Sequence, residues 1–401
     1  MAGAGAFGRN HLRVYRELEV AGLGVALVAV VEPDEARAAD AAAKYGIPVF
    51  ASVDQLLSAD LKLDAASVAV PTVQHHAVAS ALLDAGLDLL VENPLAASLK
   101  EANDLIERAE KGSRIVQPGH LERFNPAVLA VEPKLRRPMF FESHRLSVFT
   151  PRALDVDVVL DLMIHDLDIV LTFAASPVRE VRAVGLPILS PKVDIANVRV
   201  EFESGCVANF TASRVSTERV RKLRFFEPRQ YVSIDYARRD LLVIRMDGDA
   251  VGTQPTGIAS LVQKAMAAGL DPGKLAALAA ALPADVVASI TAGKIDAEVM
   301  AKITATGLID SAILAKLGFS TQGPAPGLSF IKPEVTPGEP LKLEIQSFIE
   351  SVRTRREPRV TARQGRDALA LALEIQASME AHAERAGLKD FFRGGGAASS
   401  F

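Results

Sequence analysis

Apolar runs and helical stretches alternate along residues 1–118, and this alternation constrains the fold more than any other feature of the sequence. The β-branched run Val25–Val31 is followed by an Ala-rich stretch, Glu35–Tyr45, which ends at Gly46. The same order recurs with strand candidates at Asp64–Val70, Leu89–Val91 and Ile115–Gln117 and helix candidates at Ala77–Ala85 and Leu99–Glu110. Such a β-α-β-α order predicts an α/β fold with a doubly wound parallel sheet.

From about residue 138 the alternation of strand and helix candidates gives way to a series of strand candidates. Short turns join successive strand candidates, which predicts an α+β domain with a large, mostly antiparallel open sheet. The one strong helix there is Val158–Ala174, and two amphipathic helices, Leu341–Arg353 and Arg366–Arg385, follow later. The strand candidates are Met139–Phe149, Val181–Pro187, Ala196–Phe202, Cys206–Ser213, Leu223–Phe226, Tyr231–Tyr236 and Leu241–Met246.

We therefore expect two domains, residues 1–118 and 119–401, in this chain of 401 residues. Residues 253–325 are Ala-rich, helical in period and punctuated by Gly and Pro. We interpret them as a helical insertion that packs on the body of the protein or on another subunit. Residues 389–401 contain a glycine run and are expected to form a disordered tail.

Composition excludes several classes of partner. The net charge of −4 gives no reason to expect nucleic acid or an anionic membrane as a partner. No segment reaches the roughly 18 apolar residues of a membrane span, and no signal peptide precedes the first apolar run. Cys206 is the only cysteine, so no intrachain disulfide is possible, and we expect it to be buried in a strand. These features fit a cytoplasmic protein.

A G-x-G-x-x-G pattern stands at the start of the chain. In such a loop Gly3 makes the tight turn, Gly5 lets the backbone approach a pyrophosphate, and Gly8 allows close packing of helix on strand. Ala6 and Phe7 complete the loop, and a helix is expected to follow it. The pattern predicts a dinucleotide-binding loop.

Glu32 ends the next strand candidate, and its charge indicates which cofactor, NAD or NADP, the loop binds. A carboxylate at this point accepts hydrogen bonds from the ribose diol and repels a 2′-phosphate. Pro33, Asp34 and Glu35 follow it, and no arginine stands directly after it. The expected cofactor is therefore NAD rather than NADP.

The glycine loop lacks the strand that normally precedes it, since only Met1 and Ala2 stand before Gly3. That strand is central in a sheet of this type, so its loss predicts a gap with unpaired backbone between its neighbours. We expect the first strand to be truncated and the chain to be N-terminally short.

Four motifs resemble those of the Gfo/Idh/MocA oxidoreductase family, and the resemblance covers most of residues 1–252 and 330–388. It implies a Rossmann domain, then an α/β domain whose open sheet forms oligomer contacts in a dimer or tetramer. It also implies NAD chemistry without a metal. The motifs are the loop Gly3–Gly8, the segment from Val70 through Pro71 and Thr72 to His75, the segment Glu92, Asn93 and Pro94, and the pair Asp161 and His165.

The resemblance also indicates a substrate class. The segment with His120, Arg123 and Asn125 is similar to the family's domain junction and is expected to contact substrate. Residues 144–166 resemble most the sugar-nucleotide members, such as UDP-N-acetylglucosamine 3-dehydrogenases. Arg145 and Arg152 could grip a diphosphate, because Arg binds phosphate oxygens bidentately; the alternative is that they are solvated.

A second basic cluster, Arg219, Arg221, Lys222 and Arg224, alternates along a strand candidate. We interpret it mainly as a solvated or intersubunit face. Contact with a phosphate is the alternative.

The chemistry of alcohol oxidation requires a base that reaches the hydroxyl proton. Asp161 and His165 are four residues apart, hence on one face of a helix, where the Asp would orient the His and stabilise its charge. Asp168 shares that face. A metal site built from these three side chains is the less favoured alternative.

Asn93 departs from the family pattern, in which a Lys contacts cofactor and substrate hydroxyl and moves a proton. Asn donates and accepts hydrogen bonds but does not titrate. We expect an NAD-dependent dehydrogenase of sugars or sugar nucleotides in which His165 is the base and Asn93 positions the alcohol. The alternatives are a catalytically silenced relative that binds NAD and a sugar as a sensor or partner subunit, and a scaffold that binds no cofactor.

Overall fold

The structure is a computed structural model that describes residues 1–150, 156–246, 280–291 and 328–388, together with residues 273, 277, 302, 303, 305 and 306. Its chain forms two compact units. The first contains Met1–Pro228, Val232–Leu241 and Pro333–Phe401, and the second contains Arg229–Tyr231 and Leu242–Lys332. Every site residue discussed below belongs to the first unit. The predicted boundary between residues 118 and 119 falls inside that unit and stays a prediction.

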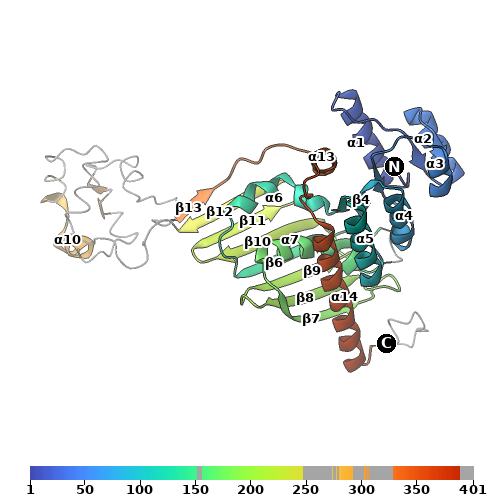
Figure 1. The fold of residues 1–401 in the computed structure, drawn as a ribbon. Coiled ribbons are helices and arrows are strands. Elements are labelled where there is room, and N and C mark those ends of the chain that lie inside the picture. Colours follow the sequence, from blue (N-terminus) through green and yellow to red (C-terminus); the bar gives the residue numbers. More distant parts are fainter. Residues whose placement is uncertain are drawn as a thin grey trace. The chain divides into compact units, whose positions relative to one another are not determined.

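Parallel strands form the sheet of the N-terminal segment, as the sequence predicts (Figure 1). Ala2 bridges β1 and β3 in parallel and thereby joins the two parts of this sheet. The strands are β1 (Val30–Val31), β2 (Val49–Phe50), β3 (Ala65–Val68), β4 (Asp88–Glu92) and β5 (Val116–Gly119).

The predicted gap beside the first residues is present. Ala2 donates its amide to the Ser67 carbonyl at 2.8 Å and holds the central position. Behind it lies a cavity of about 660 Å³, lined by residues 24–29 on one side and 62–67 on the other. Only Val30 and Val31 of the predicted strand Val25–Val31 pair with a neighbour, because the rest of that strand borders the cavity.

Helices α1 to α5 surround this sheet, and local signals fix their ends. Asp34 caps α2 by accepting the Arg37 amide, and Gly46 ends α2 in the left-handed conformation, as predicted. Ser98 caps α5 in the same way. The helices are α1 (Gly8–Val20), α2 (Glu35–Tyr45), α3 (Val53–Ser58), α4 (Thr72–Asp84) and α5 (Leu99–Gly112).

The second sheet of the first unit is mostly antiparallel, as predicted, and has the strand order β11-β10-β6-β9-β8-β7. The pair β6–β9 is parallel, whereas β7–β8, β8–β9 and β10–β6 are antiparallel. Cys206 is buried, as expected, but it lies directly before β9 rather than in a strand. The strands are β6 (Phe140–Leu146), β7 (Val178–Leu186), β8 (Ile195–Phe202), β9 (Val207–Ser213), β10 (Val220–Glu227) and β11 (Gln230–Asp235).

Alternation along these strands buries one face of the sheet. In β8, Val198 and Val200 are buried and Arg199 is exposed. Helix α14 (Ala362–Arg385) packs along β7 and against α7 (Ile164–Ala174), so helices cover the buried face (Figure 1). The remaining helical elements of this unit are η1 (Leu121–Phe124), α6 (Pro126–Val131), η2 (Glu132–Lys134), α13 (Pro340–Thr354) and α14 (Ala362–Arg385).

The second unit contains most of β12 (Asp240–Met246), which pairs in antiparallel fashion with β13 (Leu328–Ile331), a strand that the sequence analysis missed. Helix α10 (Ala284–Thr291) lies within the predicted insertion 253–325. The rest of that insertion, apart from isolated residues, and the predicted tail 389–401 lie outside the described residues. None of the helices that the structure describes is both long and apolar enough to cross a bilayer.

The long helix predicted at Val158–Ala174 is not one regular α-helix. It begins as a π-helical turn, η3 (Val159–Met163), and continues as α7 (Ile164–Ala174). The Asp157 carboxylate accepts the amides of Val159 and Leu160 at 2.9 and 3.0 Å and so fixes the start of the turn. π-Turns of this kind occur frequently at functional sites.

Candidate active site

The glycine loop has the steric properties that dinucleotide binding requires. A Cβ on Gly3, whose φ is +92°, would lie 2.5 Å from the Ala69 carbonyl oxygen, and one on Gly8 would lie 2.1 Å from the Gly3 oxygen. No described atom comes within 4 Å of such a Cβ on Gly5. The backbone is therefore open at Gly5, at the start of α1, where helix amide groups attract an anion. These residues fit the pyrophosphate of a dinucleotide.

Glu32 is held at the edge of this loop. Its buried carboxylate accepts the Ala4 amide at 2.7 Å and the Asp34 amide at 3.0 Å. Arg37 lies 3.1 Å from the same carboxylate, in a contact that the sequence analysis did not foresee. Ala6 and Phe7 form the turn before α1, where the Phe7 ring meets the His11 ring edge-on.

Replacing Gly3 with Ala is expected to lower NADH affinity by at least about tenfold, because the loop must open by more than an ångström to admit the Cβ. Gly22→Ala is the matched control, since Gly22 also has a positive φ (+71°) but has no described neighbour within 4 Å of the added carbon. Fluorescence titration with NADH measures both variants. Equal affinities would show that the close approach at Gly3 does not shape the cofactor site.

The ends of β3 and β4 bring together several residues of the predicted cofactor site. His75 is buried, and its Nδ1 and Nε2 lie 2.8 and 2.9 Å from the carbonyl oxygens of Pro94 and Val70. The ring therefore ties Val70, before α4, to the loop after β4; Pro71 is the N-cap of α4 and Thr72 its first residue. This contact keeps two of the family-like motifs side by side.

Glu92 anchors the loop that carries Asn93. Its Oε1 lies 2.8 Å from His11 Nε2, and its Oε2 accepts the Asn93 amide at 3.4 Å. Gly119 packs so closely on the carboxylate that a Cβ there would lie 2.8 Å from Oε2. Asn93 Oδ1 is buried without a hydrogen-bond partner among the described residues. It is thus available to a ligand hydroxyl.

Two residues of this region escaped the sequence analysis. One is His11, which the sequence separates widely from Glu92. The other is Glu344 of α13, which is fully buried and has no hydrogen-bond partner for either carboxylate oxygen in the described part of the chain. Burial, and then the charge of Glu92, raises the pKa of Glu344 well above its ordinary value. Neither residue lies in a motif that the sequence singles out.

His165 is the second residue of α7, and its Nδ1 is buried without a hydrogen-bond partner within the described residues. Asp161 lies in the π-turn η3 and does not bond to this nitrogen, and its orienting role toward His165 stays a prediction. Burial, followed by the charge of Arg145 and by His120, lowers the pKa of His165 to about 3. The imidazole is accordingly neutral at physiological pH.

Arg145 lies in a buried network beside His165. It donates from Nε and Nη2 to Asp166 at 2.7 and 3.0 Å and from Nη1 to Glu122 at 3.1 Å, and it stacks over the Tyr236 ring. All three guanidinium nitrogens are engaged, so the predicted diphosphate contact would require Arg145 to leave this network. Arg152, the other arginine predicted for that role, lies outside the described residues.

The three predicted substrate residues before α6 are all buried. Arg123 and Asn125 bond to protein groups: Arg123 lies 3.5 Å from Asp168, and Asn125 donates to Glu122 at 3.1 Å. His120 lies 3.8 Å from Asp168, and neither ring nitrogen has a hydrogen-bond partner among the residues placed by the structure. Of the three, His120 has the polar atoms best suited to meet a ligand.

In the described chain, no three His, Cys, Asp or Glu side chains converge on a metal position.

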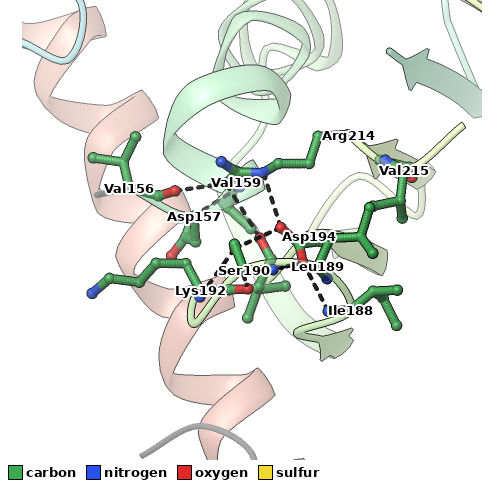
Figure 2. Close-up of polar contacts among 12 residues, drawn as sticks. Val156, Asp157, Val159, Ile188, Leu189, Ser190, Lys192, Asp194, Arg214 and Val215 are labelled. Carbon is green, nitrogen blue, oxygen red and sulfur yellow. Dashed lines mark hydrogen bonds and ion pairs between the residues drawn. The ribbon is translucent and has the colours of Figure 1, made fainter. Parts of the chain in front are cut away.

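A buried ion pair supports the segment that leads into η3 (Figure 2). Asp194 accepts the amides of Ile188, Leu189 and Ser190 at 2.6–2.8 Å and lies 3.4 Å from Arg214 Nε. Arg214 Nη2 donates to the Val156 carbonyl at 2.6 Å, directly before the turn that precedes His165. The pair thus links the β7–β8 loop to the start of the segment η3–α7, which contains His165.

Replacing Asp194 with Ala is expected to destabilise the protein by about 3–5 kcal/mol, because the Arg214 guanidinium would stay buried without this carboxylate. Burial alone raises the pKa of Asp194, but the hydrogen bonds from Ser190 and the neighbouring amides outweigh it and leave the pKa below its ordinary value. The contribution is therefore present above the unfolded pKa of about 3.9 and is lost as the pH falls below it. Urea unfolding at neutral and acidic pH measures both effects; a variant as stable as the wild type would contradict them.

The fold and the glycine loop define an NAD-binding oxidoreductase, and comparison with known proteins specifies its family. The family domain described as "Oxidoreductase family, NAD-binding Rossmann fold" matches residues 1–120, and the "GFO/IDH/MocA C-terminal domain" matches residues 128–229. The chain belongs to the Gfo/Idh/MocA family. Its N-terminal region is an NAD-binding Rossmann domain.

Several relatives act on sugars or polyols. A UDP-N-acetylglucosamine 3-dehydrogenase of Acidithiobacillus ferrooxidans is 36% identical over 60% of this chain and 74% of the relative. A solved structure of that enzyme has a TM-score of 0.71 at 28% identity and covers 95% of this chain and 96% of its own. The scyllo-inositol 2-dehydrogenase (NAD(+)) of Bacillus subtilis is 26% identical over 48% of this chain and 61% of the relative.

Proposed function

We propose that this protein oxidises a secondary hydroxyl of a sugar nucleotide with NAD, and that UDP-N-acetylglucosamine at C3 is the substrate. The observation that carries the proposal is the neutral, buried imidazole of His165, whose Nδ1 has no hydrogen-bond partner among the described residues. A neutral imidazole nitrogen accepts the proton that an alcohol releases on oxidation. The similarity to the Acidithiobacillus enzyme supports the choice of substrate.

Each residue of the site has a defined task in this proposal. NAD, when bound by the glycine loop and Glu32, supplies the hydride acceptor. Asn93 Oδ1 accepts a hydrogen bond from the substrate and orients the alcohol. His165 takes the hydroxyl proton, and the charge of Asp166, which raises the pKa of His165 against the larger effect of burial, stabilises the imidazolium.

The presence of Asn at position 93 supports a second candidate function. General acid–base assistance is typically worth about 10²–10⁴-fold in rate, and Asn93, which does not titrate, supplies none. The alternative is thus a family member that binds NAD and a sugar ligand as a sensor or partner subunit, without turnover.

Incubation of the full chain with NAD and a panel of UDP-sugars distinguishes these functions, with NADH formation and NADH binding recorded separately. The proposal expects binding together with steady NADH formation from UDP-N-acetylglucosamine. Binding without turnover on any sugar favours the sensor, and no binding at all contradicts both.

We also propose a cytoplasmic homo-oligomer, a dimer or a tetramer. The outer face of the second sheet supports it, because the half-buried Phe140 and the exposed Phe226 lie there with ring centres 5.4 Å apart. Light scattering after size-exclusion chromatography tests the proposal, and a monomer at micromolar concentration would contradict it.

A further inference from the structure

Arg221 lies directly opposite Arg145 in the register of β10 and β6. Directly opposed residues of an antiparallel pair share one face of the sheet, and two like charges in that position are destabilising unless they are compensated. Arg145 is compensated by Asp166 and Glu122. Arg221 is exposed, and no carboxylate in the described part of the chain forms an ion pair with it.

The charge that acts most strongly on Arg221 is the like charge of Arg145. Partial burial, and then this charge, lowers the pKa of Arg221, whereas Glu122 and Asp166, which are both bonded to Arg145, raise it by less. Arg221 in turn lowers the pKa of His165, so its charge acts at the imidazole. The two carboxylates on this side are already bonded to Arg145, and Arg221 has no ion-pair partner of its own in the described part of the chain, so an anionic ligand would supply one.

The register also divides the basic cluster found in the sequence between two faces. Lys222 is opposite His144, and Arg224 is opposite Glu142, to which it donates at 3.1 Å. Both alternate with Arg221 along β10, so they lie on the outer face of the sheet. Of the two arginines in β10, Arg221 is the one that lies on the same face as Arg145, and it forms no ion pair with a described carboxylate.

We propose that Arg221 binds the phosphate oxygens of the substrate, so that the site selects a sugar that carries a diphosphate over an uncharged sugar or polyol. The proposal rests on the proposed function and names the residue that would determine its specificity. A guanidinium suits this task because its planar donors match phosphate oxygens in pairs. Arg145 would stay bonded to Asp166 and Glu122 and would not contact the phosphate.

The test is the binding of UDP to the full chain, measured by calorimetry for the wild type, Arg221→Gln and Arg224→Gln. Hydrogen bonds to a charged group are worth about 1.5–3 kcal/mol, or roughly 10–100-fold in affinity. Arg221→Gln is expected to weaken UDP binding by that factor and to leave NADH binding unchanged. Arg224→Gln, on the same strand but the outer face, is expected to bind UDP as the wild type does. Arg221→Lys keeps the charge, and is expected to retain part of the affinity if Arg221→Gln does not fold.

The outcomes separate this inference from the function on which it rests. Wild-type affinity for UDP in a folded Arg221→Gln variant overturns the inference, even if the protein oxidises UDP-N-acetylglucosamine. Loss of UDP binding in Arg221→Gln alone supports the inference, even if the wild type proves to have no turnover. A wild type that oxidises free sugars or inositol and does not bind UDP overturns both the inference and the proposed substrate.

Discussion

Replacing His165 with Asn is expected to lower kcat for sugar-nucleotide oxidation by about 10²–10⁴-fold, the usual worth of a positioned base. NADH affinity is expected to stay within about twofold, because His165 lies on α7 and not in the glycine loop. His76→Asn is the matched control, since His76 is paired with Asp104 on the surface of α4 and α5. Steady-state kinetics together with NADH titration measure both variants. A kcat near the wild-type value for His165→Asn would exclude this residue as the base.

The lowered pKa of His165 predicts a second effect of the same substitution, on how the stability of the protein depends on pH. Because the folded pKa is about 3 and the unfolded value is about 6.5, the unfolded chain binds more protons between these limits. The neutral imidazole therefore imposes no stability loss above about pH 6.5, and stability decreases as the pH falls from there toward 3. His165→Asn is expected to flatten this part of the stability profile in chemical unfolding. A variant with an unchanged profile would contradict the burial of a neutral ring.

Replacing Asn93 with Lys is expected to raise kcat by about 10–10³-fold, because it restores a titratable group next to the substrate hydroxyl. The local structure can receive the ammonium, since the carboxylate of Glu92 adjoins this position and already accepts the backbone amide of Asn93. Asn103→Lys, at an exposed position of α5, adds the same charge away from the site and serves as the control. NADH formation from UDP-N-acetylglucosamine measures the rates.

An unchanged rate for Asn93→Lys, with folding confirmed by circular dichroism, would show that this position does not limit catalysis. In that case His165 or another group would carry out the whole proton transfer. A rate that rises from zero in the wild type to a measurable value would instead identify the natural protein as the silenced relative.

The sequence predicts those parts of the fold that local signals determine. Helix α2 has the predicted bounds because Asp34 caps it and Gly46 ends it. The β-branched run Val25–Val31 predicts a longer strand than β1, in which only the last two residues pair, since Ala2 alone bridges β1 and β3. The π-turn before α7 leaves no signature in an apolar helical pattern.

The candidate site was predicted less completely because its chemistry depends on contacts between distant segments. The glycine loop, Glu32 and His165 follow from motifs. The pairing of Arg145 with Asp166 and Glu122 does not, because no spacing in the sequence indicates it. Such pairing decides which arginine can meet an anion, and the register of β6 and β10 is the information that the sequence lacks.

The central claim is that a dinucleotide bound at the glycine loop receives a hydride from a sugar nucleotide beside His165. The most direct measurement is the NADH absorbance that develops when the full chain is mixed with NAD and UDP-N-acetylglucosamine. We predict catalytic NADH formation that depends on both components and is lost in His165→Asn. Protein that binds NADH but forms none from any UDP-sugar would contradict the claim.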